Sequence, residues 1–223
     1  DEVLTPALTF VATANAVSYC GATAHLCESE TTSFGLDPAK LEAHLATVAK
    51  LTPEGCYNRM TGRRIAALLP VHVFGHPCDL AGLQALAARW GLLLVEDAAE
   101  ALGSRYADKP IGGGGRVAAL SFNGNKFGTT GAGGAILTDD DTLADAAKHI
   151  TTTGKIPHRW RFDHDTVAFN YRLPNLNAAL GVAQLGHRRD LLEGLLVPAG
   201  LGGRVLLARD PADRPVQLRG APG

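Results

Sequence analysis

The stretch SFNGNKFGTTGAGGAIL, residues 121–137, decides the fold class because it joins two apolar runs through a turn of small residues. The first run, residues 117–122, ends at this turn, and the second begins at Gly134. Lys126 is the only charged residue of the stretch, and it stands among five glycines, at positions 124, 128, 131, 133 and 134. Short apolar runs bounded by glycine are typical of strands. The pattern therefore predicts one lysine in a small-residue turn after a strand.

Similar apolar runs alternate with helical patterns along most of the chain. Strands are predicted at residues 3–7, 24–27, 65–74, 92–97, 117–122 and 134–139, and helices at 9–19, 37–50, 79–91, 140–150 and 175–185. Strands that are apolar throughout and alternate with helices indicate an α/β fold with a mostly parallel sheet covered on both faces. Ligands of such sheets bind beyond the carboxyl ends of the strands, which is where Asp97 and Lys126 are expected.

Helix ends are marked by local signals. Asp37 followed by Pro38 predicts an N-cap and a first helical residue, and Asp79 and Gly91 bracket another helix. Between the first of these helices and the next strand, residues 51–64 form a polar insert marked by Gly and Pro. The run GGGG at 112–115 favours a flexible surface turn over a binding loop.

Composition excludes several classes of protein. The chain has 223 residues, 46% hydrophobic and 19% charged, with a net charge of −1 and a pI near 6.8, which argues against nucleic acid as a partner. No apolar run approaches the roughly 20 residues that span a bilayer. The four cysteines show no CxxC pair and no ligand-like spacing with histidine. Buried reduced thiols in a cytoplasmic protein are therefore expected, and no metal.

The two ends of the chain read differently from its middle. Residues 1–185 are expected to form one large domain that lacks its N-terminal segment. Residues 186–223 are dense in Gly, Pro and Arg and show no sustained period, so we expect a disordered or frame-shifted tail. The chain is interpreted as an internal piece of a longer protein.

Two residues carry the chemistry, each with a structural alternative. Neither GxxxxGK[ST] nor GxGxxG is present, so a nucleotide fold such as that of a Rossmann dehydrogenase is weakly supported. Lys126 alone fits a solvated loop lysine, and Asp97 alone fits a cap for the residues after it. Together, at neighbouring strand ends, they suit pyridoxal phosphate, which needs an amine to bind its aldehyde and a carboxylate at its ring nitrogen.

Four ordered blocks carry a resemblance to a known family. TPALTFVATANAV, VEDAAEALGS, SFNGNKFGTTGAGG and FNYRLPNLNAALGVAQL resemble the DegT/DnrJ-type sugar aminotransferases, over residues 1 to about 185. The resemblance implies the fold of the type I, aspartate aminotransferase-like enzymes, pyridoxal 5'-phosphate as cofactor, and a homodimer with shared active sites. It also implies that residues 186–223 stand in place of a small C-terminal domain. The insert near 52–63 and the segment GKIPHRWRFDHD are similar to the branch that aminates UDP-linked 4-keto-6-deoxy-hexoses on routes to bacillosamine or legionaminic acid.

The resemblance assigns roles residue by residue. Lys126 matches the lysine that binds the cofactor and shuttles a proton, and Asp97 matches the partner of the ring nitrogen. Ser121 matches a hydroxyl at the cofactor phosphate, and Phe10 an aromatic ring stacked on the pyridine. Asn170 matches an asparagine that reaches the phosphate of the neighbouring subunit's cofactor. Without the resemblance, Ser121, Phe10 and Asn170 would be read as a strand-end serine, a core phenylalanine and a capping residue.

Some positions depart from the family or stay open. Glu100 stands where Gln or His is common, and its acid would oppose an anionic ring oxygen unless it were protonated or turned away. The basic loop of Lys155, His158, Arg159 and Arg161 either binds the diphosphate of a sugar nucleotide or is a solvated charge run. His158 and Arg159 are kept as substrate-binding candidates.

The implied activity is transfer of an amino group from glutamate to the 4-keto group of a nucleotide-linked deoxysugar. Related 3-dehydratases carry histidine in place of the lysine, so Lys126 favours transamination. A cyclitol or 3-keto-sugar aminotransferase, and a truncated remnant without catalysis, remain as alternatives.

Overall fold

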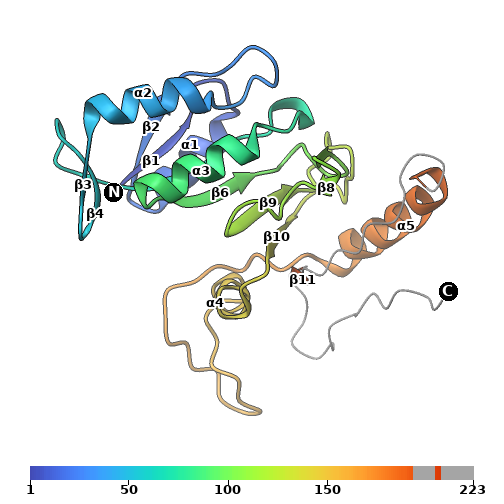
Figure 1. Cartoon of the computed structure of the whole chain (residues 1–223). Coiled ribbons are helices and arrows are strands. Elements are labelled where there is room, and N and C mark those ends of the chain that lie inside the picture. The colour runs from blue at the N-terminus through green and yellow to red at the C-terminus, as the bar shows by residue number, and fades with distance from the viewer. Residues whose placement is uncertain (193–203, 207–223) are drawn as a thin grey trace. The chain divides into compact units, whose positions relative to one another are not determined.

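The computed structural model describes residues 1–192 and 204–206, and the chain divides into two units, Asp1–Leu120 and Ser121–Gly223 (Figure 1). The first unit is built on a parallel sheet with the strand order β9-β6-β5-β1-β2. Its strands are β1 (Glu2–Pro6), β2 (Thr23–Cys27), β5 (Arg64–Leu68), β6 (Leu93–Asp97) and β9 (Val117–Ser121). The predicted parallel sheet is confirmed.

Three helices pack on this sheet, α1 (Val11–Tyr19), α2 (Pro38–Val48) and α3 (Leu80–Trp90). Figure 1 shows α2 and α3 side by side in front of the strands and α1 behind them. The predicted caps are present. Asp37 accepts hydrogen bonds from the amides of Ala39 and Lys40, and Gly91 ends α3 with φ +64°.

The core of the first unit lies between the sheet and helices α2 and α3. Fully buried leucines come from each layer, and each contributes about 1.5–3 kcal/mol by leaving water; they are Leu4, Leu41, Leu45, Leu68 and Leu83. Leu41 and Leu45 are one turn apart on α2 and so lie on the same face of the helix.

Two strand predictions need correction. The polar insert after α2 contains a hairpin of β3 (Ala49–Thr52) and β4 (Gly55–Asn58), and β4 continues the sheet antiparallel to β5. The predicted strand at 65–74 ends at Leu68, because Pro70 has no amide proton to donate, and a short 3-10 turn, η1 (Val73–Gly75), follows. A second small hairpin, β7 (Arg105–Tyr106) with β8 (Lys109–Pro110), lies between β6 and β9.

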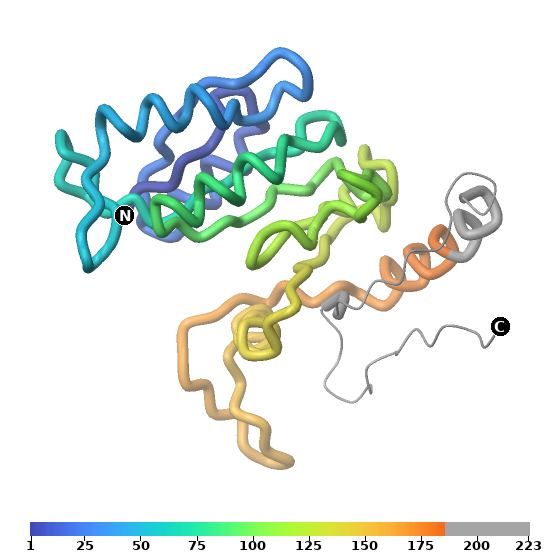
Figure 2. Tube along the Cα trace, in the orientation of Figure 1, coloured from blue at the N-terminus to red at the C-terminus, as the bar shows by residue number. Residues whose placement is uncertain are grey.

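The second unit holds β10 (Gly134–Thr138), α4 (Asp141–Thr151) and α5 (Asn175–Leu192). Figure 2 shows the long extended excursion of the chain between α4 and α5. β11 (Arg204–Leu206) pairs antiparallel with β10. The expected tail begins at 186, inside the span of α5, and its residues 193–203 and 207–223 lie outside the described part of the chain.

All four cysteines lie in the described residues, and none forms a disulfide. Cys27, Cys56 and Cys78 are buried as predicted, whereas Cys20 is exposed. Burial raises the pKa of the Cys78 thiol to about 12. The sequence spacing placed no cysteine with a histidine, but in space Cys27 lies beside His25 and His44. None of the described helices has the length and apolar character that crossing a bilayer requires.

Candidate active site

Asp97 ends β6, and backbone and side-chain bonds hold it on several sides. Its amide donates to the carbonyl of Pro70, and its carbonyl accepts from the amide of His72. Its Oδ2 accepts a 2.6 Å hydrogen bond from Thr13 Oγ1, and its Oδ1 accepts a 3.1 Å bond from the amide of Ala99. The carboxylate therefore caps the turn that follows β6, which is the structural role that its position alone suggested. Two of its roughly four lone-pair positions are used, so it retains acceptor capacity.

Phe10 lies at the start of α1 and is linked to the Asp97 carboxylate through Thr13. Its carbonyl accepts from the amide of Thr13, the residue that bonds Asp97. The side chain of Phe10 is not part of the core, because the residue is 75% exposed. Thr9 supports the same turn through a 2.7 Å bond between its Oγ1 and that of Thr13. The exposed ring is available for stacking on a planar ligand.

Glu100 follows Asp97 by three residues, and its carboxylate is engaged by a neighbouring turn. Its Oε2 accepts a 2.9 Å hydrogen bond from the amide of Phe74. Phe74 has φ +53° and is 74% exposed, a conformation that is strained for a bulky residue. The acid thus fixes the 3-10 turn η1, and a cofactor-binding role for Glu100 stays a prediction.

Lys126 lies half-buried in a closed loop of the second unit. The loop is tied at its base because Phe122 donates to Gly133 and Thr130 donates to Phe122 through their backbones. The amide of Lys126 donates to the carbonyl of Asn123, which forms the turn that carries the lysine. Gly131 and Gly133 have φ of +82° and +94°, a region that L side chains rarely adopt. These two glycines are therefore required for the return of the chain to β10.

Helix α5 supports this loop through two side chains that the sequence analysis missed. Gln184 Oε1 accepts from the amide of Thr129 at 3.1 Å, and Asn177 Nδ2 donates to the carbonyl of Thr130 at 2.5 Å. Asn177 and Gln184 are seven positions apart, which is about two helical turns and places both side chains on one face of α5. That spacing was the available signal for a supporting role.

Ser121 and Asn170 occupy extended backbone of the second unit. The Oγ of Ser121 accepts from the amide of Asn123 at 3.3 Å, so its hydroxyl proton can still be donated. Asn170 is exposed and forms an isolated antiparallel bridge with Thr152. It does not cap a helix, because α5 begins five residues later.

The basic loop between α4 and α5 is largely engaged within itself. His158 Nδ1 accepts from the amides of Trp160 and Arg161. The Arg159 guanidinium lies 4.8 Å from the centre of the Trp160 ring, and the Lys155 amine lies 3.9 Å from that of Phe162. These contacts account for the loop without a ligand, and His158 and Arg159 remain substrate-binding candidates.

Glu96, the neighbour of Asp97, is fully buried and performs a structural role. Its Oε2 accepts from His72 Nε2 at 3.0 Å, and its Oε1 accepts from the amides of Gly114 and Gly115. A Cβ at Gly115 would lie 2.7 Å from the carbonyl of Leu94. The glycine run is a turn, as predicted, with Gly113 exposed, but Gly114 and Gly115 pack closely and hold a buried carboxylate, which the prediction of a surface turn did not include.

The residues of the first unit suit pyridoxal phosphate in two respects. A carboxylate with unused acceptor positions ends a parallel strand, and an exposed aromatic ring begins the helix bonded to it. Taken by itself, the second unit offers the amine of Lys126 and the hydroxyl of Ser121, groups of the kinds that suit the aldehyde and the phosphate of this cofactor.

The fold is that of the pyridoxal phosphate-dependent transferases of type I. Residues 1–194 match the DegT/DnrJ/EryC1/StrS aminotransferase family, and the chain belongs to this family. The resemblance carried by the four sequence blocks is thereby confirmed.

Three relatives illustrate the match. A GDP-perosamine synthase of Caulobacter vibrioides is 44% identical over 185 residues, which are 83% of this chain and 45% of that protein. A dTDP-3-amino-3,4,6-trideoxy-alpha-D-glucose transaminase of Streptomyces venezuelae is 39% identical over 225 residues, which are 97% of this chain and 54% of that protein. Helicobacter pylori PseC, an aminotransferase involved in the biosynthesis of pseudoaminic acid, matches with a TM-score of 0.73 and 26% identity over 85% of this chain and 47% of that one. The chain spans about half the length of these relatives.

Proposed function

We propose that the protein to which this chain belongs transfers an amino group from glutamate to the 4-keto group of a nucleotide-linked deoxysugar, with pyridoxal phosphate as cofactor. The observation that carries the proposal is Lys126, a half-buried lysine in a loop tied by its own backbone and by α5. Family membership and the nucleotide sugars named for two relatives support it.

Each candidate residue receives one task. Pyridoxal phosphate, when bound, supplies an aldehyde that captures amines and a ring that withdraws electrons from the bond being broken. Lys126 Nζ would hold the aldehyde of the cofactor, and the same amine would move the proton of the glutamate α-carbon. Asp97 keeps a proton on the ring nitrogen, oriented by Thr13.

The remaining residues bind and orient. Phe10 stacks on the ring, and Ser121 donates its hydroxyl proton to the phosphate. Glu100 holds the turn of Phe74 at the edge of the site. Asn170 reaches the phosphate in the partner subunit of a homodimer, and His158 with Arg159 binds the diphosphate of the sugar nucleotide.

The position of the keto group on the sugar distinguishes the two candidate functions, amination at C4 and amination at C3. The name of the Streptomyces venezuelae relative specifies a 3-amino sugar, which favours the 3-keto-sugar alternative as the second candidate. The two relatives also differ in nucleotide, GDP against dTDP, and the sequence resemblance pointed to UDP. The carbon and the nucleotide are therefore the finer parts of the proposal.

Covalent trapping tests the role of Lys126. The longer protein to which this chain belongs is incubated with pyridoxal phosphate, reduced with borohydride and digested. The masses of the peptides are then measured by mass spectrometry. We expect the phosphopyridoxyl mass on Lys126, and its loss in Lys126→Ala. Lys148→Ala, at an exposed site of α4, is the control and should be labelled like the wild type. Labelling spread over several lysines would contradict the proposed role and support a remnant without catalysis.

Substrate assays test the sugar. The same protein is supplied with glutamate and with 4-keto-6-deoxy-hexoses linked to UDP, GDP or dTDP, and amino-sugar products are followed by mass. The proposal expects a product from at least one 4-keto substrate. Amination of 3-keto sugars alone would establish the second candidate, and amination of simple 2-keto acids alone would reject both.

A further inference from the structure

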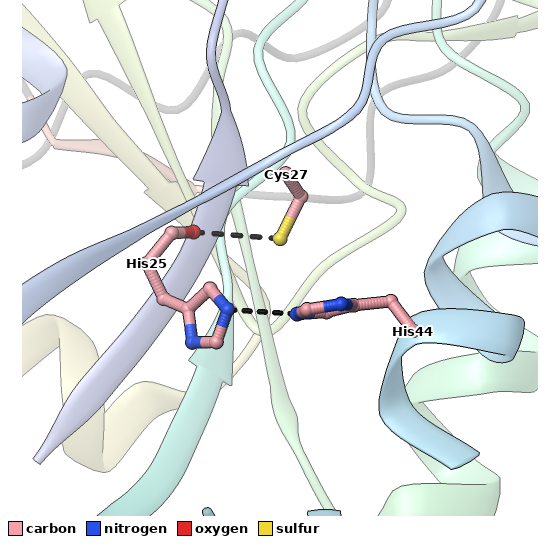
Figure 3. Close-up of side chains that lie close together, drawn as sticks. All are labelled: His25, Cys27 and His44. Carbon is pink, nitrogen blue, oxygen red and sulfur yellow. Dashed lines mark hydrogen bonds between the residues drawn. The ribbon is translucent and has the colours of Figure 1, made fainter. Parts of the chain in front are cut away.

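His25, Cys27 and His44 form a compact group of donor atoms in the first unit, outside the residues assigned to the cofactor (Figure 3). The two histidine Nε2 atoms lie 2.8 Å apart, and the two rings meet edge to face with their centres 5.0 Å apart. All three donor atoms lie within 4.8 Å of one another. His25 and Cys27 alternate along β2 and so share one face of the strand, and α2 brings His44 to that face.

A buried carboxylate orients the first of these histidines. Glu2 Oε2 lies 2.9 Å from His25 Nδ1, and the side chain of Glu2 is 3% exposed. Glu2 is itself fixed by Asn58 Nδ2 at 2.9 Å and by Thr61 Oγ1 at 2.5 Å. An acceptor at Nδ1 places the ring proton on that nitrogen, which leaves the lone pair of Nε2 directed at His44. Carboxylates that hold histidine in this way are a regular part of metal sites.

We propose that His25 Nε2, His44 Nε2 and Cys27 Sγ bind a divalent late transition metal of the zinc type. Two imidazole nitrogens and one thiolate are a donor set that zinc favours and that calcium and magnesium do not. A fourth position would be filled by water, because the side chain of His25 is 17% exposed and opens the group to solvent.

The geometry requires a small adjustment. Zinc binds nitrogen at about 2.0 Å and sulfur at about 2.3 Å, so a tetrahedral site places its two nitrogens about 3.3 Å apart. The two Nε2 atoms, 2.8 Å apart, therefore move apart by about half an ångström, and a nitrogen–sulfur separation of up to 4.8 Å closes to about 3.5 Å, which requires turns of the His44 and Cys27 side chains. On binding, Cys27 loses its thiol proton to solvent and the His44 proton moves to Nδ1, so one proton is released for each metal ion.

Metal bound here would join β2 to α2. Cys27 belongs to the buried core, whereas α2 contributes His44 from its half-buried side. Ligands that bind only the folded state stabilise it. At a metal concentration about 100 times the dissociation constant, we expect the thermal midpoint to rise by about 5–10 °C.

The competing explanation is a hydrogen-bonded chain from Glu2 through His25 to His44 without metal. Cobalt distinguishes the two, because Co²⁺ in a site with a thiolate absorbs in the near ultraviolet by charge transfer as well as in the visible. The whole chain without a histidine tag, reduced and freed of metal by chelation, is titrated with CoCl₂. The proposal expects both bands, saturation at one equivalent, and displacement by ZnCl₂.

Three variants complete the test, with circular dichroism as the check of folding. Cys27→Ser should lose the near-ultraviolet band, and His44→Asn should bind Co²⁺ at least tenfold more weakly. Cys20→Ser removes an exposed thiol and should behave as the wild type. Absence of binding to the folded wild type, or a charge-transfer band that survives in Cys27→Ser and is lost in Cys20→Ser, would overturn the proposal. Because these readouts need no pyridoxal phosphate, the result is independent of the proposed function.

Discussion

Thr13 donates a 2.6 Å hydrogen bond from its Oγ1 to Oδ2 of Asp97, and so connects the first turn of α1 to the end of β6. The two residues are 84 positions apart in the sequence, and Thr13 is almost fully buried. Thr9 and Phe10 bond to Thr13 in turn. The orientation of the proposed ring-nitrogen partner therefore depends on a residue that carries no charge.

Replacing Thr13 tests this dependence. Thr13→Val keeps the shape and removes the hydroxyl, and we expect the longer protein to bind pyridoxal phosphate about tenfold more weakly, since a hydrogen bond to a charged group contributes about 1.5 kcal/mol or more. Titration followed by cofactor absorbance measures the affinity. Thr13→Ser keeps the donor and should retain most of the affinity. Equal affinities for the Val and Ser variants would disprove the orienting role.

The α5 supports of the lysine loop predict a local change in dynamics. Gln184→Ala removes the acceptor of the Thr129 amide, so that amide should exchange its proton with solvent about fivefold faster. Hydrogen exchange read by mass spectrometry over residues 122–133 measures it. Ala179→Ser, at an exposed position of the same helix, is the matched control. Unchanged protection in Gln184→Ala would show that the loop is held by its backbone bonds alone.

Glu96 predicts a pH dependence of stability. Burial raises the pKa of this carboxyl, but hydrogen bonds from His72, Gly115 and Gly114 outweigh it and leave the pKa below its ordinary value. A folded pKa below the unfolded value of about 4.3 gives stability that is present above that pH and lost as the pH falls. The urea midpoint should therefore decline steeply below about pH 5.

Two variants isolate the Glu96 contribution. Glu96→Gln should lower stability by about 1–3 kcal/mol at pH 7 and flatten the acid decline, because an amide places a donor against glycine amides. Glu54→Gln removes a charge from an exposed turn and should leave both quantities near the wild type. A decline as steep in Glu96→Gln as in the wild type would assign the acid sensitivity to other groups.

Gly75 predicts a steric requirement beside Glu100. It has φ +80°, and a Cβ there would lie 2.8 Å from the carbonyl oxygen of Glu100. Gly62 has a similar φ of +70° with open space around it. We expect Gly75→Ala to cost about 1–3 kcal/mol more than Gly62→Ala in urea unfolding, since only the first adds a clash to the backbone strain. Equal costs would mean that the η1 turn can shift away.

The sequence predicted where helices and strands form better than it predicted which strands pair with one another. Helix α3 was bracketed by Asp79 and Gly91, and both act as caps. The hairpin β3–β4 was missed because its pairing with β5 depends on register, and the insert that contains it is polar. Asp97 and Lys126 were identified as candidates because each follows an apolar run. Thr13, which bonds Asp97, and Gln184, which bonds the lysine loop, follow no such pattern and were not identified.

Local signals in the sequence by themselves determined the class of fold, because a cap or an apolar period acts between residues a few positions apart. The tertiary structure alone decided that Glu96 is anchored by a glycine run and that His25, Cys27 and His44 converge. These contacts join segments 17 or more residues apart, and only the packing of α2 and the loops against the sheet brings them together.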